Sequence, residues 1–257
     1  MPSIAELIGL SGHSGTFFCN NCLCPQWALE RSSNRIHALS SNSKNVQAIG
    51  SFPTRTLASI RHDHKQFIIE ADGKESQAKN YNNCVRPCLV HTEIDNHIVP
   101  TPLHLVMGVA ERLLDAIELK CREWNSIESL QQLLGKHNVR RSSAHGGRLT
   151  GDAATRLLKI PCDSVKLIPG SNQEWINSWC ELLTITSNIS HLIQRATPLC
   201  DHEITRVVEQ CTTLSWKWHE FFPERIFPKL HVLCIDLPRF IQQHRTVSDN
   251  RVHKIHT

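Results

Sequence analysis

The chain has 257 residues, of which 40% are hydrophobic and 20% are charged. This composition is typical of a globular protein large enough to bury a core, and it excludes an intrinsically disordered chain. The formal net charge is +4 with 16 histidines counted as neutral, a mildly basic balance that permits a nucleic-acid partner without requiring one.

No run of about 18 apolar residues occurs, so we expect no membrane-spanning helix. The segment Met1–Leu7 has no basic residues and carries an early acid, so it does not resemble a signal peptide. The 11 cysteines are scattered and odd in number, unlike the cysteines of a secreted disulfide scaffold. These features predict a reducing compartment, either the nucleus or the cytoplasm.

Residues 1–100 show no sustained periodicity, and we expect an irregular segment there. Ser40–Asn45 and Asp72–Lys74 have the composition of loops, and Phe67–Ile69 and Glu93–Val99 are candidates for short strands. Within this segment, Cys19 and Cys22 are separated by two residues, a spacing that lets two thiolates face one metal ion and supply half of a tetrahedral zinc site. Residues 1–100 are therefore predicted to be a zinc-knuckle-containing segment.

From Thr101 onward the pattern predicts a mainly α domain over residues 101–245. Thr101 is a candidate N-cap, Pro102 suits the first helical turn, and apolar residues then recur at helical spacing up to Ile117. Residues 246–257 are predicted to be a loose tail. Further helices are expected from Asn125 to Gly135, from Asp152 to Lys159, from Ser171 to Ile193, from Asp201 to Trp218, and from Pro228 to Gln243 with a kink at Pro238.

A basic loop is predicted between two of these helices, over Lys136–Arg148. It contains Lys136, Arg140, Arg141 and Arg148 and no acidic residue, so these four side chains are candidates for contacts with nucleic-acid phosphates. The alternative is an ordinary solvated loop. Aromatic residues near Trp218 follow helical spacing, which favours core packing over base stacking.

The second half of a zinc site has two candidate locations. The first is local and consists of residues from the same N-terminal segment: His62, His64, Cys84, Cys88, His91 and His97. The second is remote and combines His231 with Asp236 or Cys234. His231 and Cys234 are three positions apart and share a helix face, whereas five positions, as between His231 and Asp236, fit a straight helix poorly.

The segment from Leu7 to Cys22, in which a Gly-Leu-Ser-Gly turn runs into the CxxC pair, resembles Transib-type transposases and the V(D)J recombinase catalytic subunit. Three later segments resemble that family in the same order: Val99–His104, Arg148–Leu158 and Lys229–Pro238. The resemblance implies the helical, zinc-stapled insertion domain of an RNase H-like transposase. It implies that Cys19, Cys22 and His231 bind structural Zn²⁺, with Asp236 replacing the family's second histidine and Cys234 in reserve.

That family cuts DNA with three carboxylates that hold two divalent metals. The resemblance places the two aspartates before Met1 and the glutamate near Val252, where no acid stands. We therefore expect no catalytic residues and an inactive fragment that keeps DNA as a partner in the nucleus, with a homodimer as a further hypothesis. The alternatives are a helical protein-interaction module and a metal hydrolase built on Asp63 and Asp72 with their neighbouring histidines.

Overall fold

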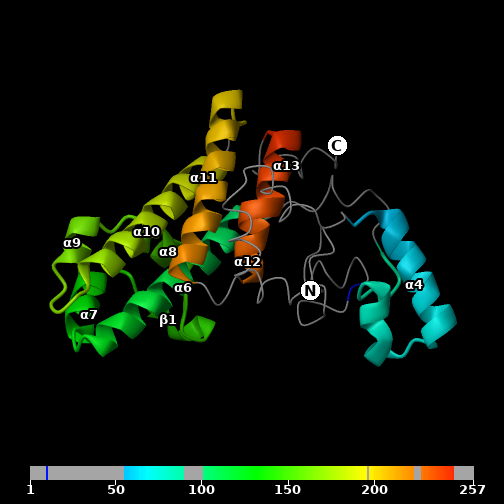
Figure 1. Ribbon diagram of the computed structural model, residues 1–257, viewed down its shortest axis with the longest axis horizontal. Helices are drawn as coiled ribbons and strands as arrows, with labels where there is room; N and C mark the ends of the chain where they lie inside the picture. The colour runs from blue at the N-terminus through cyan, green and yellow to red at the C-terminus, as the bar shows by residue number, and fades with distance from the viewer. Residues whose placement is uncertain (1–9, 11–54, 90–100, 196, 223–226, 246–257) are drawn as a thin grey trace. The chain divides into compact units, whose positions relative to one another are not determined.

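The computed structural model describes residues 10, 55–89, 101–195, 197–222 and 227–245 (Figure 1). The chain divides into two compact units. The first comprises Met1–Val99 with Glu224–Pro228, and the second comprises Pro100–Pro223 with Lys229–Thr257. The described residues are mainly helical, as predicted. No helix among them is long and apolar enough to cross a lipid bilayer.

In the first unit, helix α4 (Leu57–Ala71) is followed by the 3₁₀ helix η2 (Glu75–Tyr81). Thr56 caps α4, because its hydroxyl accepts from the Ser59 backbone N–H while the Ser59 hydroxyl accepts from the Thr56 N–H. The prediction of a strand over Phe67–Ile69 is wrong, since these residues lie inside α4. One side of the helix is buried, through Leu57, Ile60, Phe67 and Ala71, whereas Ile68 and Ile69 are exposed.

A buried arginine connects α4 and η2. Arg55 is 1% exposed, and its Nη1 donates to the backbone oxygen of Asn82 at 2.9 Å. The Asn82 amide in turn donates to the Asp63 carboxylate on α4, also at 2.9 Å. The rings of Phe67 and Tyr81 meet edge to face at a centroid distance of 5.8 Å, so polar and aromatic contacts together hold η2 against α4.

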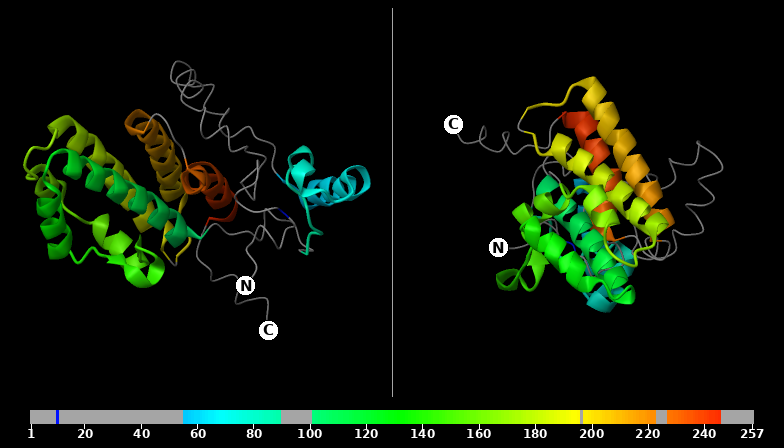
Figure 2. Two further views of the ribbon diagram at one scale, coloured as in Figure 1. Left: turned by 90° about the horizontal axis from the view of Figure 1, so that it is seen from below. Right: turned by 90° about the vertical axis from the view of Figure 1, so that its left-hand side faces the viewer.

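The second unit is organised around three long helices: α6 (Pro102–Glu123), α10 (Gln173–Ile193) and α11 (Asp201–Phe221). Helix α10 packs against both α6 and α11 (Figures 1 and 2). As the stripe of apolar residues predicted, α6 begins at Pro102 and buries one face, including Val109, Leu113 and Ile117, each 0% exposed. The indole N–H of Trp179 on α10 donates to the Leu113 carbonyl at 2.8 Å and ties the two helices together.

Shorter elements cover α6. Helix α8 packs along it, α7 follows it, and a two-stranded antiparallel hairpin lies between α7 and α8. The predicted loop over residues 136–148 therefore contains regular structure. The elements are α7 (Ile127–Lys136), β1 (Arg141–Ser142), the 3₁₀ turn η3 (Ser143–His145), β2 (Arg148–Leu149), α8 (Gly151–Leu157) and α9 (Cys162–Lys166).

The last part of the unit is helical from α12 (Pro228–His231) through a π-helical turn, η4 (Val232–Asp236), into α13 (Leu237–His244). In η4 the Leu237 N–H bonds to the Val232 carbonyl, five residues back. A π turn widens the helix just before Pro238, whose ring would otherwise clash with the carbonyl four residues earlier. The expected irregularity at Pro238 is thus a π turn. Lys229 of α12 lies directly over Gly108 of α6.

A row of aromatic rings joins the end of α6, the start of α10 and the end of α11. Trp124 contacts Trp175 at 5.5 Å between centroids, Trp175 contacts Phe221 at 4.8 Å, and Phe221 contacts Phe222 at 4.6 Å. Trp218, 2% exposed, packs on Phe222 at 4.6 Å. Trp218 belongs to the buried core, as the helical spacing predicted, whereas the other four rings are half-buried.

Candidate nucleic-acid interface and metal ligands

The hairpin formed by β1 and β2 divides the predicted basic residues between two faces. Arg141 pairs with Leu149 and Ser142 pairs with Arg148. Opposite residues of an antiparallel pair lie on the same face, and successive residues alternate between faces. Leu149 is 3% exposed, so the Arg141–Leu149 face is turned inward and the Ser142–Arg148 face outward.

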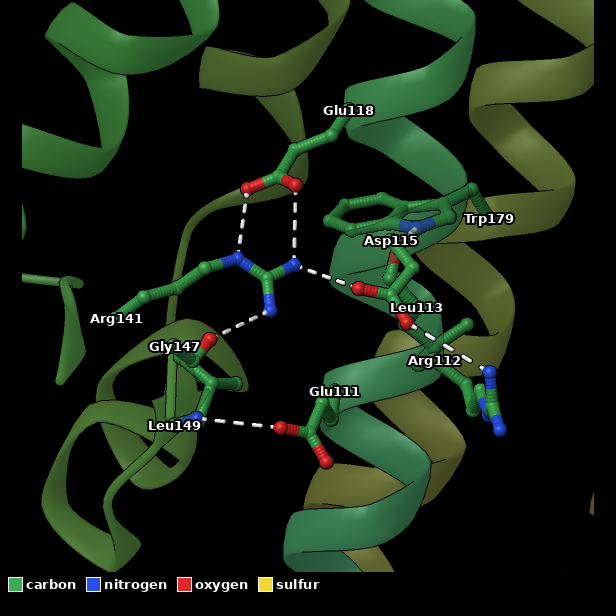
Figure 3. A network of polar contacts seen from close by, with 9 residues as sticks. All are labelled: Glu111, Arg112, Leu113, Asp115, Glu118, Arg141, Gly147, Leu149 and Trp179. Atoms are coloured by element: carbon green, nitrogen blue, oxygen red, sulfur yellow. Dashed lines mark hydrogen bonds and ion pairs between the residues drawn. The ribbon is translucent and has the colours of Figure 1, made fainter. Parts of the chain in front are cut away.

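Arg141 clamps the hairpin to α6 (Figure 3). Its Nε donates to Glu118 at 3.2 Å, and its Nη2 donates to Glu118 at 3.0 Å and to Asp115 at 2.6 Å. Its Nη1 donates to the Gly147 carbonyl across the hairpin turn at 3.3 Å. Partial burial acts to lower the pKa of Arg141, but the hydrogen bonds to Glu118 and Asp115 outweigh it and raise that pKa.

Three carboxylates of α6 accept hydrogen bonds from this hairpin. Glu111, Asp115 and Glu118 follow one another at intervals of four and three residues, which places them on the same helix face. Glu111 accepts from the Leu149 backbone N–H at 3.4 Å (Figure 3). The apolar stripe of α6 predicted the helix but not this acidic face, although the spacing of the three acids is visible in the sequence.

The other three predicted basic residues are exposed. Lys136 is the last residue of α7, Arg140 immediately precedes β1, and Arg148 lies on the outer face of β2. Since Arg140 continues the alternation of β1, it belongs with Arg148 on the outward side. At the turn, Gly146 and Gly147 have positive φ values of 63° and 77°, and a methyl group added at either would meet no atom within 4 Å.

One further cation, missed by sequence reasoning, borders this group. The Nε of Arg156 on α8 donates to the Asn138 carbonyl at 3.0 Å in the segment between α7 and the hairpin. Arg156 is exposed, as are Lys136, Arg140 and Arg148. Because Arg141 is paired with Asp115 and Glu118, the exposed positive charge of this region is that of Lys136, Arg140, Arg148 and Arg156. We call these four residues the outer basic group.

The two C-terminal zinc candidates lie close together in the fold. His231 Nε2 and Asp236 Oδ2 are 3.8 Å apart, and the two side chains are 3% and 4% exposed. The π turn widens the helix between these positions, so residues five apart are brought to one side. Cys234 is also buried, and its pKa is raised first by burial and then by the neighbouring Cys211 thiol.

The zinc prediction also needs Cys19 and Cys22, which lie outside the described residues. The same holds for His91 and His97 of the local alternative. Within the described ranges, no three His, Cys, Asp or Glu side chains are grouped so that they could hold a metal ion. Burial raises the pKa of Cys84 to about 12 despite the opposing effect of Arg55. Asp63, a residue of the hydrolase alternative, accepts from Asn82.

No protein-family model matches the chain, and no curated protein matches it. The resemblance to Transib-type transposases therefore stays a prediction, and the geometry of the hairpin carries the functional proposal.

Proposed function

We propose that this protein is a transposase-derived helical domain that binds duplex DNA in the nucleus through its outer basic group, without cutting it. The observation that supports this proposal is that the arginines of the hairpin point to two faces with different roles. Arg141 fixes the hairpin to α6, while Arg140 and Arg148 stand on its exposed side.

A fixed hairpin favours phosphate binding for an energetic reason. Arginines on a mobile loop lose conformational freedom when they bind, and that loss offsets part of the electrostatic gain. Here the backbone is already held by the Arg141 ion pairs and by the Leu149 N–H···Glu111 bond. The open Gly146–Gly147 turn adds two residues without side chains beside the exposed cations, which lets a phosphate backbone approach closely.

Binding of this kind depends on salt. If three phosphates are neutralised, the affinity should fall about 40-fold between 50 and 200 mM salt, from a slope of about −0.9 per contact. Because these contacts reach the phosphate backbone, the preference for one DNA sequence over another should be small.

The test compares two variants of equal charge. The Arg140→Ala/Arg148→Ala variant should lose about two units of the salt slope and most of its affinity for duplex DNA. The matched Arg122→Ala/Arg206→Ala variant removes two exposed arginines of α6 and α11 and should bind as the wild type does. If both variants bind equally well, or if neither they nor the wild type bind DNA, the proposal is wrong. The protein-interaction alternative then becomes the better explanation.

Structural Zn²⁺ is part of the same proposal. His231 and Asp236 are buried side by side, which suits two ligands of one Zn²⁺ ion. The resemblance supplies Cys19 and Cys22 as the other two ligands. Elemental analysis of protein purified without chelators should find one zinc per chain, and Cys19→Ser/Cys22→Ser should lose it. A zinc-free wild-type protein would remove this part of the proposal and leave the DNA interface to stand on its own test.

A further inference from the structure

Two cysteines of the second unit face each other between α9 and α10. Cys162 is the first residue of α9, and Cys180 lies in the first half of α10. The Cys162 Sγ donates to the Cys180 carbonyl at 3.8 Å, and the Cys180 Sγ donates to the Cys162 carbonyl at 4.0 Å. Each thiol therefore lies over the other residue's backbone.

This reciprocal arrangement places each thiol beside the other residue's main chain, so the two side chains are neighbours. Burial raises the pKa of Cys180, and the hydrogen bond with the Cys162 thiol raises it further. A third group closes the site, because Thr184 Oγ1 lies 4.0 Å from the Cys162 Sγ and donates to the Cys180 carbonyl at 2.9 Å. A disulfide requires two cysteines whose side chains lie close together, and the reciprocal contacts place Cys162 and Cys180 side by side.

We propose that Cys162 and Cys180 form a reversible disulfide, with a small-molecule disulfide of the glutathione type as the oxidant. The difference in exposure between the two cysteines determines which one reacts first. The half-exposed Cys162 is accessible to the oxidant, whereas Cys180 is 5% exposed and acts second.

The reaction proceeds by two thiol–disulfide exchanges. In the first, the Cys162 thiolate attacks one sulfur of glutathione disulfide, forming a mixed disulfide and releasing one glutathione thiolate. In the second, Cys180 loses its proton and attacks the Cys162 sulfur, releasing the second glutathione. Two protein thiols are oxidised, one glutathione disulfide is reduced to two glutathiones, and the two protons end on the released glutathiones.

The bond would fasten α9 to α10 across 18 positions of sequence. Helix α9 also packs against α7, whose last residue is Lys136. Oxidation would therefore restrain the short helix α9, which has five residues. The thermal midpoint should rise in the oxidised form.

Peptide mass spectrometry tests this on the full-length protein. After incubation with glutathione disulfide and alkylation of the remaining thiols, the wild type should yield a cross-linked Cys162–Cys180 peptide pair. In Cys180→Ser, Cys162 should instead retain glutathione, about tenfold more than in the wild type, because the intramolecular second step is lost. The exposed Cys200 is the internal control and should carry glutathione equally in both proteins.

Two results would overturn the proposal. One is equal glutathione on Cys162 in wild type and Cys180→Ser. The other is a wild type in which Cys200 is modified while Cys162 and Cys180 both remain thiols. If Cys180→Ser fails to fold, the presence or absence of the cross-linked wild-type peptide decides. A Cys162→Ser variant, in which Cys180 should stay unmodified, confirms the order of the two steps.

Discussion

Replacing Arg141 by alanine should destabilise the protein, whereas replacing Arg140, the adjacent residue, should not. Arg141 is 29% exposed and Glu118 22%, so this doubly hydrogen-bonded pair is only partly screened by water. We assign it about 1 kcal/mol, between the value of an exposed pair and that of a charged hydrogen bond. The bond to Asp115, which is 46% exposed, adds about 0.5 kcal/mol.

The variant also loses a neutralising charge. Asp115 and Glu118 are three residues apart on α6, and their mutual repulsion would add about 0.2 to 0.5 kcal/mol once the guanidinium is gone. The expected total for Arg141→Ala is about 2 kcal/mol, which corresponds to a fall of roughly 4 to 7 °C in thermal midpoint for a domain of this size. Arg140→Ala should change the free energy of unfolding by less than about 0.5 kcal/mol.

Urea denaturation of both variants measures these differences directly. A double-mutant cycle with Glu118→Ala should show that the cost of Arg141→Ala falls by about half when its main partner is absent. Equal stability of Arg141→Ala and the wild type, or an unchanged cost in the Glu118→Ala background, would refute the clamp. In that case the orientation of the hairpin would need another explanation.

Two further predictions concern the glycines of α6 and α7 and the first turn of α11. Gly135→Ala in α7 should stabilise the protein by about 0.5 to 1 kcal/mol, because helix propensity improves and no atom lies within 4 Å of the added methyl. Gly108→Ala should give no such gain in the same thermal melts, since its methyl would lie 2.3 Å from Lys229 Cδ; equal gains would contradict the close helix contact. The pKa of Glu203 is lowered from 4.5, first by the hydrogen bond from the Cys200 backbone N–H and then by Arg195. The ionised Glu203 therefore contributes stability above pH 4.5, and this contribution disappears as the pH falls through the lowered pKa. Glu203→Gln should therefore be less stable than the wild type at pH 7 and approach it in strongly acidic buffer, whereas a pH-independent difference would count against this linkage.

The helices of the second unit were largely predictable from the sequence, but their starts were less so. Helix α6 begins at Pro102 as expected, because proline at the first position and a long apolar stripe are both local signals. Helix α10 is capped by Asn172 and not by Ser171, and the Asn172 side chain accepts from the Trp175 N–H at 3.0 Å. Adjacent residues with similar capping ability cannot be distinguished without the backbone.

Helix α4 and the hairpin were missed for other reasons. The amphipathic pattern of α4 is sparse, with four buried residues among many charged ones, and its capping box uses Ser59 where glutamate is typical. The hairpin strands are two residues long, below the length at which alternation is recognisable. The role of Arg141 depends on acids 23 and 26 positions away, a tertiary contact that no local pattern reveals.

The row of rings at the shared end of α6, α10 and α11 has a practical consequence. The ring centroids of Trp124 and Trp175 are 5.5 Å apart, and the ring planes meet at 84°. At this distance the excited states of the two rings can couple. Near-ultraviolet circular dichroism and intrinsic fluorescence should therefore register the joining of these three helix ends, and the protein carries its own optical probe of whether they are assembled.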